Sequence, residues 1–277
     1  MLMANSGETP LPDYEQPPVI EVVCGIQFEP MANFQATTFG LFWQTIRDEY
    51  IQAQEMAPLP QVIEQFPPVA KISQSRLEIL STLPLPRIFF VNKIPSWLIQ
   101  LQRDRFLHNW RKEKDDDIYP RYPVVLDKFW KAWEKFSKFC KDENLGEPTV
   151  NQLEITYINH IPVDHGWKTL GDLGKVFPDV GWRCEERFLP FPESIGLGLS
   201  FILPESQGRL HVSLKHAIRV ADSQPVLLCE LTARGMSASK NSSAIRAWFD
   251  LGREWIVRGF ADFIDKKIQK EQWGRKV

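Results

Sequence analysis

Apolar residues recur along this chain with two different periods, and each period predicts a different kind of element. Residues Val19–Phe28 are a run of β-branched and apolar side chains flanked by prolines, which is typical of a buried strand. The next apolar side chains have the spacing of a helix: Phe39, Phe42, Trp43, Ile46 and Tyr50. Residues 57–68 contain four prolines, so we expect a surface loop there.

Shorter apolar segments follow, and prolines separate them. They predict antiparallel strands at Val69–Gln74, Arg76–Ser81, Arg87–Val91 and Trp97–Phe106, with breaks at Pro84, Pro86 and Pro95. A long helix is then predicted from about Pro123 to Glu143, because its apolar residues again have helical spacing. Its apolar face consists of Leu126, Phe129, Trp130, Trp133, Phe136 and Cys140.

The second half of the chain repeats this order of elements. A strand is predicted at Thr149–Ile161 and a short helix at Leu170–Phe177. Three further strands are predicted at Glu186–Leu203, His211–Val220 and Val226–Thr232. A last helix is predicted from about Ser242 to Gln272, with Asn241 or Ser242 as its cap.

This repeated order predicts an α+β fold made of two units. Residues 1–17 would be a flexible N-terminal segment, followed by units at 18–147 and 148–277. Each unit would have an antiparallel curved sheet covered on one face by a long helix, as in a TATA-binding-protein-like or ferredoxin-like duplication. The alternative is one continuous curved sheet that grips the last helix. A doubly wound parallel sheet is disfavoured, since strands and helices do not alternate regularly.

Composition excludes several classes of protein. The 277 residues include 33 Lys and Arg and 35 Asp and Glu, which gives a net charge of −2, and 43% of them are hydrophobic. These values exclude fibrous and wholly disordered chains. The four cysteines form no C-x-x-C pair, so we expect thiols in a reducing compartment and neither a metal nor a cofactor. Without a signal peptide or an apolar stretch of membrane-spanning length, a cytoplasmic location is expected.

The densest group of side chains suited to binding lies between residues 97 and 112. On a strand, Gln100, Gln102 and Asp104 would share one face, because side chains alternate between faces. The segment ends in arginine, asparagine and tryptophan, and arginine and tryptophan often anchor interfaces. The candidates for binding a partner or ligand are Gln100, Gln102, Arg103, Asp104, Arg105, Asn109, Trp110 and Arg111. The alternative is an ordinary half-exposed strand followed by a turn.

A second candidate group lies at the end of the strand predicted at Thr149–Ile161. Asn159 and His160 join the candidates for binding, and Asp164 and His165 follow closely. Residues 160 and 165 would point in opposite directions on a continued strand, and no H-x-H or H-E-x-x-H spacing occurs. Structural histidines are therefore favoured, and no catalytic residue or metal ligand is assigned.

Other motifs give poor evidence for an enzyme. The glycines of residues 196–200 are followed by a strand-like run and lack the helix and Lys-Ser/Thr pair of a phosphate loop. Close backbone packing or a bulge is the favoured explanation. No G-x-S-x-G nucleophile motif occurs, and the three consecutive aspartates at 115–117 are typical of a solvated loop.

A row of lysines marks the outer face of the helix predicted at Pro123–Glu143: Lys128, Lys131, Lys135 and Lys138. Such a row can neutralise a nucleic-acid backbone. Acidic residues dilute it, and the overall charge is slightly negative, so a solvated face is the simpler interpretation.

Five segments occur in an order that resembles a known family. They are the PPVIEV segment from Pro17, the LQRDRF segment with the following NWR from Leu101, YPRYP from Tyr119, YINHI from Tyr157 and WIVRGF from Trp255. Together they resemble a sporadically distributed family of uncharacterised bacterial proteins of about this length. The resemblance covers residues 17–273 and implies no established activity. A patchy distribution is similar to that of accessory genes, including phage-defence genes.

Three functions follow as expectations, in decreasing order. The first is a non-catalytic binding or regulatory accessory protein that engages a protein partner through its sheet face and the Arg103–Arg111 loop. The second is a nucleic-acid-binding protein that uses the lysine row. The third is a small-molecule sensor or unrecognised enzyme with Gln100, Gln102, Asp104 and His160 around a pocket. No membrane partner is expected, and the oligomeric state is left open.

Overall fold

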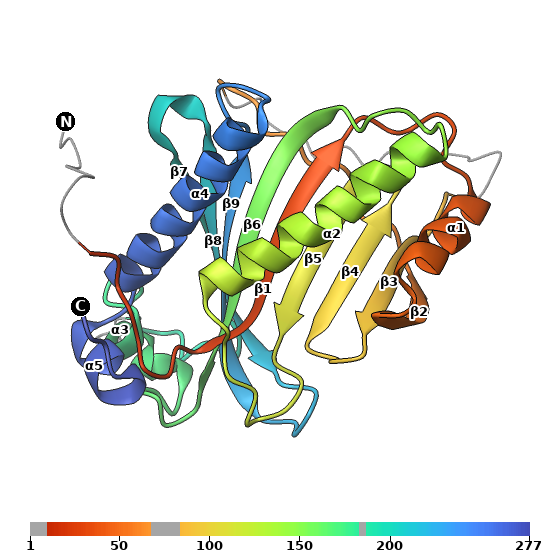
Figure 1. Cartoon of the computed structure of the whole chain (residues 1–277). Coiled ribbons are helices and arrows are strands. Elements are labelled where there is room, and N and C mark those ends of the chain that lie inside the picture. Colours follow the sequence, from red (N-terminus) through yellow and green to blue (C-terminus); the bar gives the residue numbers. More distant parts are fainter. Residues whose placement is uncertain (1–9, 68–83, 183–186) are drawn as a thin grey trace.

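The computed structural model describes residues 10–67, 84–182 and 187–277. Within these residues nine strands form one antiparallel sheet in the order β2-β3-β4-β5-β1-β6-β9-β8-β7 (Figure 1). The strands are β1 (Val19–Phe28), β2 (Tyr50–Met56), β3 (Arg87–Asn92), β4 (Trp97–Gln102), β5 (Arg105–Arg111), β6 (Val150–Pro162), β7 (Gly196–Ile202), β8 (Gly208–Ile218) and β9 (Pro225–Gly235). The α+β class with an antiparallel sheet is confirmed.

The two halves of the chain meet where β1 pairs with β6, and each of these is the first strand of its half. Beyond β1 the sheet continues with β5, β4, β3 and β2, and beyond β6 it continues with β9, β8 and β7. The two predicted sheets are therefore one continuous sheet, as in the alternative arrangement. Pairing β1 with β6 leaves neither of these apolar strands with an open edge. The division into units at residues 147 and 148 stays a prediction.

Helices cover one face of the sheet. Helix α2 (Tyr122–Asp142) packs over β1 and β5, and α4 (Ser242–Phe263) packs over β6, β8 and β9 (Figure 1). Helix α1 (Ala36–Ile46) contacts α2 and β2. The predicted bounds of α2 agree with the structure to within one residue. None of the described helices combines the length and hydropathy that a membrane crossing requires.

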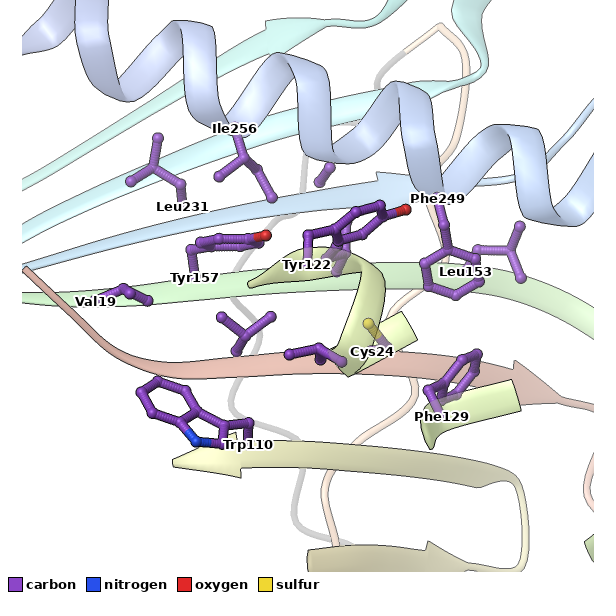
Figure 2. Close-up of a cluster of buried hydrophobic side chains, with 14 of the residues drawn as sticks. Val19, Cys24, Trp110, Tyr122, Phe129, Leu153, Tyr157, Leu231, Phe249 and Ile256 are labelled. Carbon is purple, nitrogen blue, oxygen red and sulfur yellow. The ribbon is translucent and has the colours of Figure 1, made fainter. Parts of the chain in front are cut away.

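Aromatic side chains between the helices and the sheet form the core. Phe129 of α2 lies 5.2 Å from the ring of Phe249 on α4, and this contact joins the two long helices. Phe106 of β5 stacks on Phe136 of α2 at 5.2 Å. Cys24 lies among these side chains, between β1 and α2 (Figure 2). Cys24, Cys140 and Cys229 are buried free thiols, whereas Cys184 lies outside the described residues.

The last predicted helix is two helices in the structure. Asn241 caps α4 by accepting a hydrogen bond from the Ala244 N–H at 2.8 Å, as expected. The helix ends at Phe263, and Asp265 caps α5 (Lys266–Trp273) through the Lys267 and Ile268 N–H groups. The apolar spacing continues through this break, so periodicity alone did not reveal it. The sequence feature that indicates the break is Asp265, a residue type that favours the start of a helix, in the middle of the apolar spacing.

Several strand predictions need correction. The segment Trp97–Phe106 is a hairpin in which β4 and β5 are joined by a turn at Arg103 and Asp104. Tyr50 begins β2 instead of continuing α1, and β7 begins at Gly196 instead of residue 186. The short helix predicted at Leu170–Phe177 is a 3₁₀ turn, Leu170–Asp172, followed by α3 (Leu173–Val176). The strands predicted at Val69–Gln74 and Arg76–Ser81 lie outside the described residues.

Candidate functional site

The sheet face opposite the helices carries a group of polar side chains, and residues 57–67 cross it as an extended segment that we call the strap. Four side chains beneath the strap come from adjacent strands and oppose one another in register. They are Gln102 of β4, Arg105 of β5, Gln27 of β1 and Gln152 of β6. Residues opposite each other in antiparallel strands share a face, so these four form one row, the glutamine row.

Each member of the glutamine row hydrogen-bonds the strap backbone. The Leu59 N–H donates to Gln102 Oε1 at 2.9 Å, and Gln102 Nε2 donates to the Leu59 carbonyl at 2.8 Å. Arg105 Nη2 donates to the Pro60 carbonyl at 2.9 Å. Gln102 and Arg105 are among the residues predicted to bind a partner or ligand, and the structure places both in this row.

The row continues toward the second half of the sheet. Gln27 Oε1 accepts a hydrogen bond from the Val62 N–H at 3.2 Å, and Gln152 Oε1 accepts one from the Glu64 N–H at 2.7 Å. The predicted surface loop at 57–68 is therefore docked on the sheet over its described residues. The strap contributes its backbone N–H and C=O groups to these contacts. Such contacts cannot be predicted from the spacing of apolar side chains.

Beyond the glutamine row, the carboxylate of Glu64 joins the strap to β8. Arg209 Nη1 lies 2.6 Å from Glu64 Oε2, and His211 Nε2 lies 2.7 Å from Oε1. Arg234 of β9 is 3.8 Å from Glu64 Oε1 and 3.2 Å from a carboxylate oxygen of Glu154. Burial raises the pKa of Glu64, but the hydrogen bonds from His211 and Arg209 outweigh it and lower the pKa to about 2.

His211 also connects this cluster to the edge of the sheet. Its Nδ1 lies 2.9 Å from the hydroxyl of Ser200 on β7. If Nε2–H donates to Glu64, then Nδ1 accepts the hydroxyl proton of Ser200, so both contacts fit one neutral tautomer. No motif in the sequence connects Ser200, His211 and Glu64. Glu64 lies far from the other two in the sequence, and only pairing of β7 with β8 and docking of the strap bring the three together.

A second polar row crosses the first half of the same face. Arg87 Nη1 donates to Gln100 Oε1 at 2.8 Å, and Gln100 Nε2 donates to Asn109 Oδ1 at 3.0 Å. Asn109 Nδ2 donates in turn to Glu21. Gln100 and Asn109 are both buried. Burial raises the pKa of Glu21, and the hydrogen bond from Asn109, which lowers it, offsets only part of this shift.

The remaining candidates from residues 97–112 occupy three different environments. Arg103 and Asp104 form the β4–β5 turn, where Gln102 Nε2 donates to Asp104 Oδ1 at 2.8 Å. Trp110 is buried on the helix face of β5, its ring 5.3 Å from that of Tyr119. Arg111 pairs with Glu113. The expected Arg103–Arg111 loop is instead a turn followed by a central strand, because both edges of β5 pair with neighbours.

Asn159 and His160 are neighbours on β6, and their surroundings differ. Asn159 is buried and donates a hydrogen bond to the Cys229 carbonyl at 3.1 Å. His160 is half-buried, and burial together with Arg219 lowers its pKa. Within the described residues, no three His, Cys, Asp or Glu side chains form a group that could hold a metal ion.

The lysine row lies exposed on α2, and most of its charges are paired. Lys131 is 2.8 Å from Asp127, Lys135 is 2.5 Å from Glu49, and Lys138 pairs with Asp142. Lys128 lies 4.9 Å above the ring of Trp97. These ion pairs leave little unneutralised charge for a phosphate backbone. The nucleic-acid alternative gains no support from this arrangement.

Strand β7 forms one edge of the described sheet, and its glycines do not pack closely. A Cβ added to Gly196 or Gly198 would meet no atom within 4 Å, so close packing as the reason for these glycines is wrong. Phe201 and Ile202 expose 47% and 56% of their surface. The strand has neither a charged residue nor a proline, the two features that most often protect an edge.

Comparison with known proteins adds no assignment: no protein-family model and no curated protein matches this chain.

Proposed function

We propose that this protein is a non-catalytic binding protein, and that β7 binds an extended segment of a protein partner as an additional strand. The carrying observation is the edge of β7, which is uncharged and pairs with no further strand among the described residues. The sheet face that sequence analysis expected to bind a partner already holds the strap. An accessory or regulatory role in bacterial defence or stress, as the family resemblance implies, is part of the same proposal.

The backbone of β7 has hydrogen-bonding groups to offer. The Leu203 N–H donates to the Gly208 carbonyl, and the His216 N–H donates to the Ile195 carbonyl. Hydrogen-bonded and non-hydrogen-bonded pairs alternate along an antiparallel strand. The backbone N–H and C=O groups of the odd-numbered residues of β7 therefore point toward β8. The even-numbered residues Gly196, Gly198, Ser200 and Ile202 therefore direct their N–H and C=O groups outward. Glycine at two of these positions lets a second backbone approach closely.

The side chains of β7 indicate the chemistry of the partner. Leu197 and Leu199 are half-buried on the helix face, and Phe201 and Ile202 are exposed. An uncharged, apolar edge fits an extended segment with apolar side chains, held by main-chain hydrogen bonds. The strand that pairs with β7 could also come from a second copy of this chain. The test must therefore distinguish a dimer of this chain from a complex with a different protein.

The test uses a matched pair of variants at Ser200. Ser200→Pro removes one outward N–H and leaves the bonds to β8 in place, whereas Ser200→Ala removes the same hydroxyl and keeps the N–H. Partners crosslinked to the protein in its native host would be identified by mass spectrometry. We expect one protein with crosslinks mapped to β7 in wild type and Ser200→Ala, and its loss in Ser200→Pro. An unchanged partner in Ser200→Pro contradicts the proposal, and so does a dimer of this chain as the sole assembly.

A second candidate function rests on the hydrogen-bonded chain of Ser200, His211 and Glu64. A hydroxyl, an imidazole and a carboxylate in this order are the parts of a nucleophile activated by a base, which supports acyl transfer from an ester to water. Two observations place this function second. Arg209 shares the carboxylate of Glu64, and none of the described cavities is lined by Ser200.

A fluorophosphonate probe separates the two functions. If Ser200 is an activated nucleophile, the probe labels it in wild type, and labelling is lost in Ser200→Ala and in His211→Gln. Absence of labelling in a folded wild-type protein removes the acyl-transfer candidate and leaves strand addition unaffected.

A further inference from the structure

A small cavity of about 80 Å³ lies where residues 12–19 meet β6, α4 and the start of α2. Its walls come from segments far apart in the sequence: Pro17 and Pro18, Tyr119 and Arg121, Tyr157 and Asn159, and Ile256 with Phe260. These belong to four of the five segments that sequence analysis singled out. Neither proposed function uses them.

Arg253 of α4 lines this cavity and forms no ion pair with any residue that the structure describes. Its Nε is buried and has no hydrogen-bond acceptor within the described part of the chain. Its guanidinium lies 4.8 Å from the centre of the Tyr122 ring, a contact that satisfies none of its N–H groups. Arg121, at the same cavity, is already bound to Asp13 at 3.0 Å and to the Tyr14 carbonyl at 2.9 Å. The unpaired positive charge therefore belongs to Arg253.

The tyrosine hydroxyls provide a further donor. Tyr119 and Tyr157 share one hydrogen bond, with their oxygens 3.0 Å apart. One hydroxyl donates to the other, so the second proton has no acceptor among the described residues. Burial raises the pKa of Tyr119 to about 12 and also raises that of Tyr157, so both hydroxyls keep their protons at neutral pH. Figure 2 shows Tyr122 and Tyr157 beside Ile256 beneath α4.

We propose that this cavity binds a small monocarboxylate, with its two oxygens accepting from the guanidinium of Arg253 and from a hydroxyl of the Tyr119–Tyr157 pair. An arginine N–H forms a strong, charge-assisted hydrogen bond to a carboxylate oxygen, and the second oxygen can then accept from the tyrosine hydroxyl. A single unpaired cation favours a monoanion over the doubly charged phosphate. Ile256, Phe260 and the prolines give apolar walls for a short hydrocarbon part, and the volume admits only a few heavy atoms beyond the carboxylate.

The carboxylate has two possible sources, a free short-chain acid or the carboxyl terminus of a polypeptide. Isothermal titration would compare acetate, propionate and butyrate with their amides and with inorganic phosphate. In a second arm, a tripeptide with a free carboxyl terminus would be compared with its amidated form. Binding of either carboxylate without binding of its amide supports the proposal, and the arm that binds identifies the source.

The variants keep the result independent of folding. Arg253→Gln removes the charge but keeps polar bulk, Tyr157→Phe removes one hydroxyl, and Arg246→Gln changes an exposed arginine of the same helix as a control. We expect an affinity loss of about tenfold or more for Arg253→Gln, a smaller loss for Tyr157→Phe and no change for Arg246→Gln. Equal affinity of wild type and Arg253→Gln, binding of phosphate alone, or no binding by a folded wild type would overturn the proposal. None of these outcomes depends on β7.

Discussion

The two faces of this sheet are covered in two different ways. On one face, α2 and α4 bury aromatic side chains such as Phe129 and Phe249 against the strands. On the other, the strap is held by side-chain hydrogen bonds to its backbone and by the carboxylate of Glu64. The helices are held by the buried apolar area and by the fit of their side chains. The strap is held by hydrogen bonds and ion pairs between polar groups. A change on the helix face should therefore act on the whole fold, and a change under the strap should act locally.

The largest expected effect is on the helix face. Phe129 is fully buried and contacts rings on both the sheet and α4. Phe129→Ala should lower the free energy of unfolding by about 3–5 kcal/mol, because it removes the buried ring and leaves a cavity. Urea denaturation measures this change. Val124→Ala, on the exposed side of the same helix, is the control and should change stability by less than about 0.5 kcal/mol.

The next effect belongs to the charged end of the strap and depends on pH. Glu64 has a pKa of about 2 in the folded protein, against an ordinary value of 4.5. A lowered folded pKa gives stability that is complete above about pH 5 and is lost as the pH falls toward 2, in total about 3 kcal/mol. The free energy of unfolding of wild type, measured from pH 6 to pH 2.5, should fall more steeply than that of Glu64→Gln.

The matched control is Glu205→Gln, an exposed carboxylate next to β8 with no charged partner among the described contacts. It should keep the wild-type slope. Parallel curves for Glu64→Gln and wild type would mean that the cluster of Arg209, His211 and Arg234 does not hold the strap in solution.

The difference between the two faces also explains how much the sequence could predict. The helical spacing of Phe129, Trp133 and Phe136 predicted α2 within one residue, because a buried stripe recurs at a fixed interval. Gln102 and Arg105 were predicted as binding residues from a polar segment, but the strap that they bind was not predicted as their partner. Gln27, Gln152 and Glu64 were missed, since they are single polar residues whose roles depend on strand register.

The joining of the two predicted sheets into one also depends on strand register. The apolar pattern of β1 predicts a buried strand and does not specify which strand lies beside it. Only the register with β6 decides this. Likewise, Trp97–Phe106 resembled one strand because the turn residues Arg103 and Asp104 carry neither glycine nor proline.

A smaller and local effect is expected within the glutamine row. Gln102→Ala removes both hydrogen bonds to Leu59, and the strap should open more often at that point. A loss of about 1 kcal/mol corresponds to roughly fivefold faster hydrogen exchange of the Leu59 amide. Gln54→Ala, an exposed glutamine of β2, is the control. An equal increase in exchange across core amides would show that the row supports the whole fold and not the strap alone.

The smallest effect is expected at the edge strand β7, which pairs with no further strand among the described residues. Gly198→Ala places a methyl group where no atom lies within 4 Å, so stability should change by no more than about 0.5 kcal/mol, in either direction. Gly235→Ala is the contrasting variant on β9, because its methyl group would lie 1.9 Å from the Gln207 carbonyl and must displace backbone. Thermal unfolding should separate the two by several degrees. If Gly198→Ala were as damaging as Gly235→Ala, β7 would be covered in solution, and the edge proposed for a partner strand would already be filled.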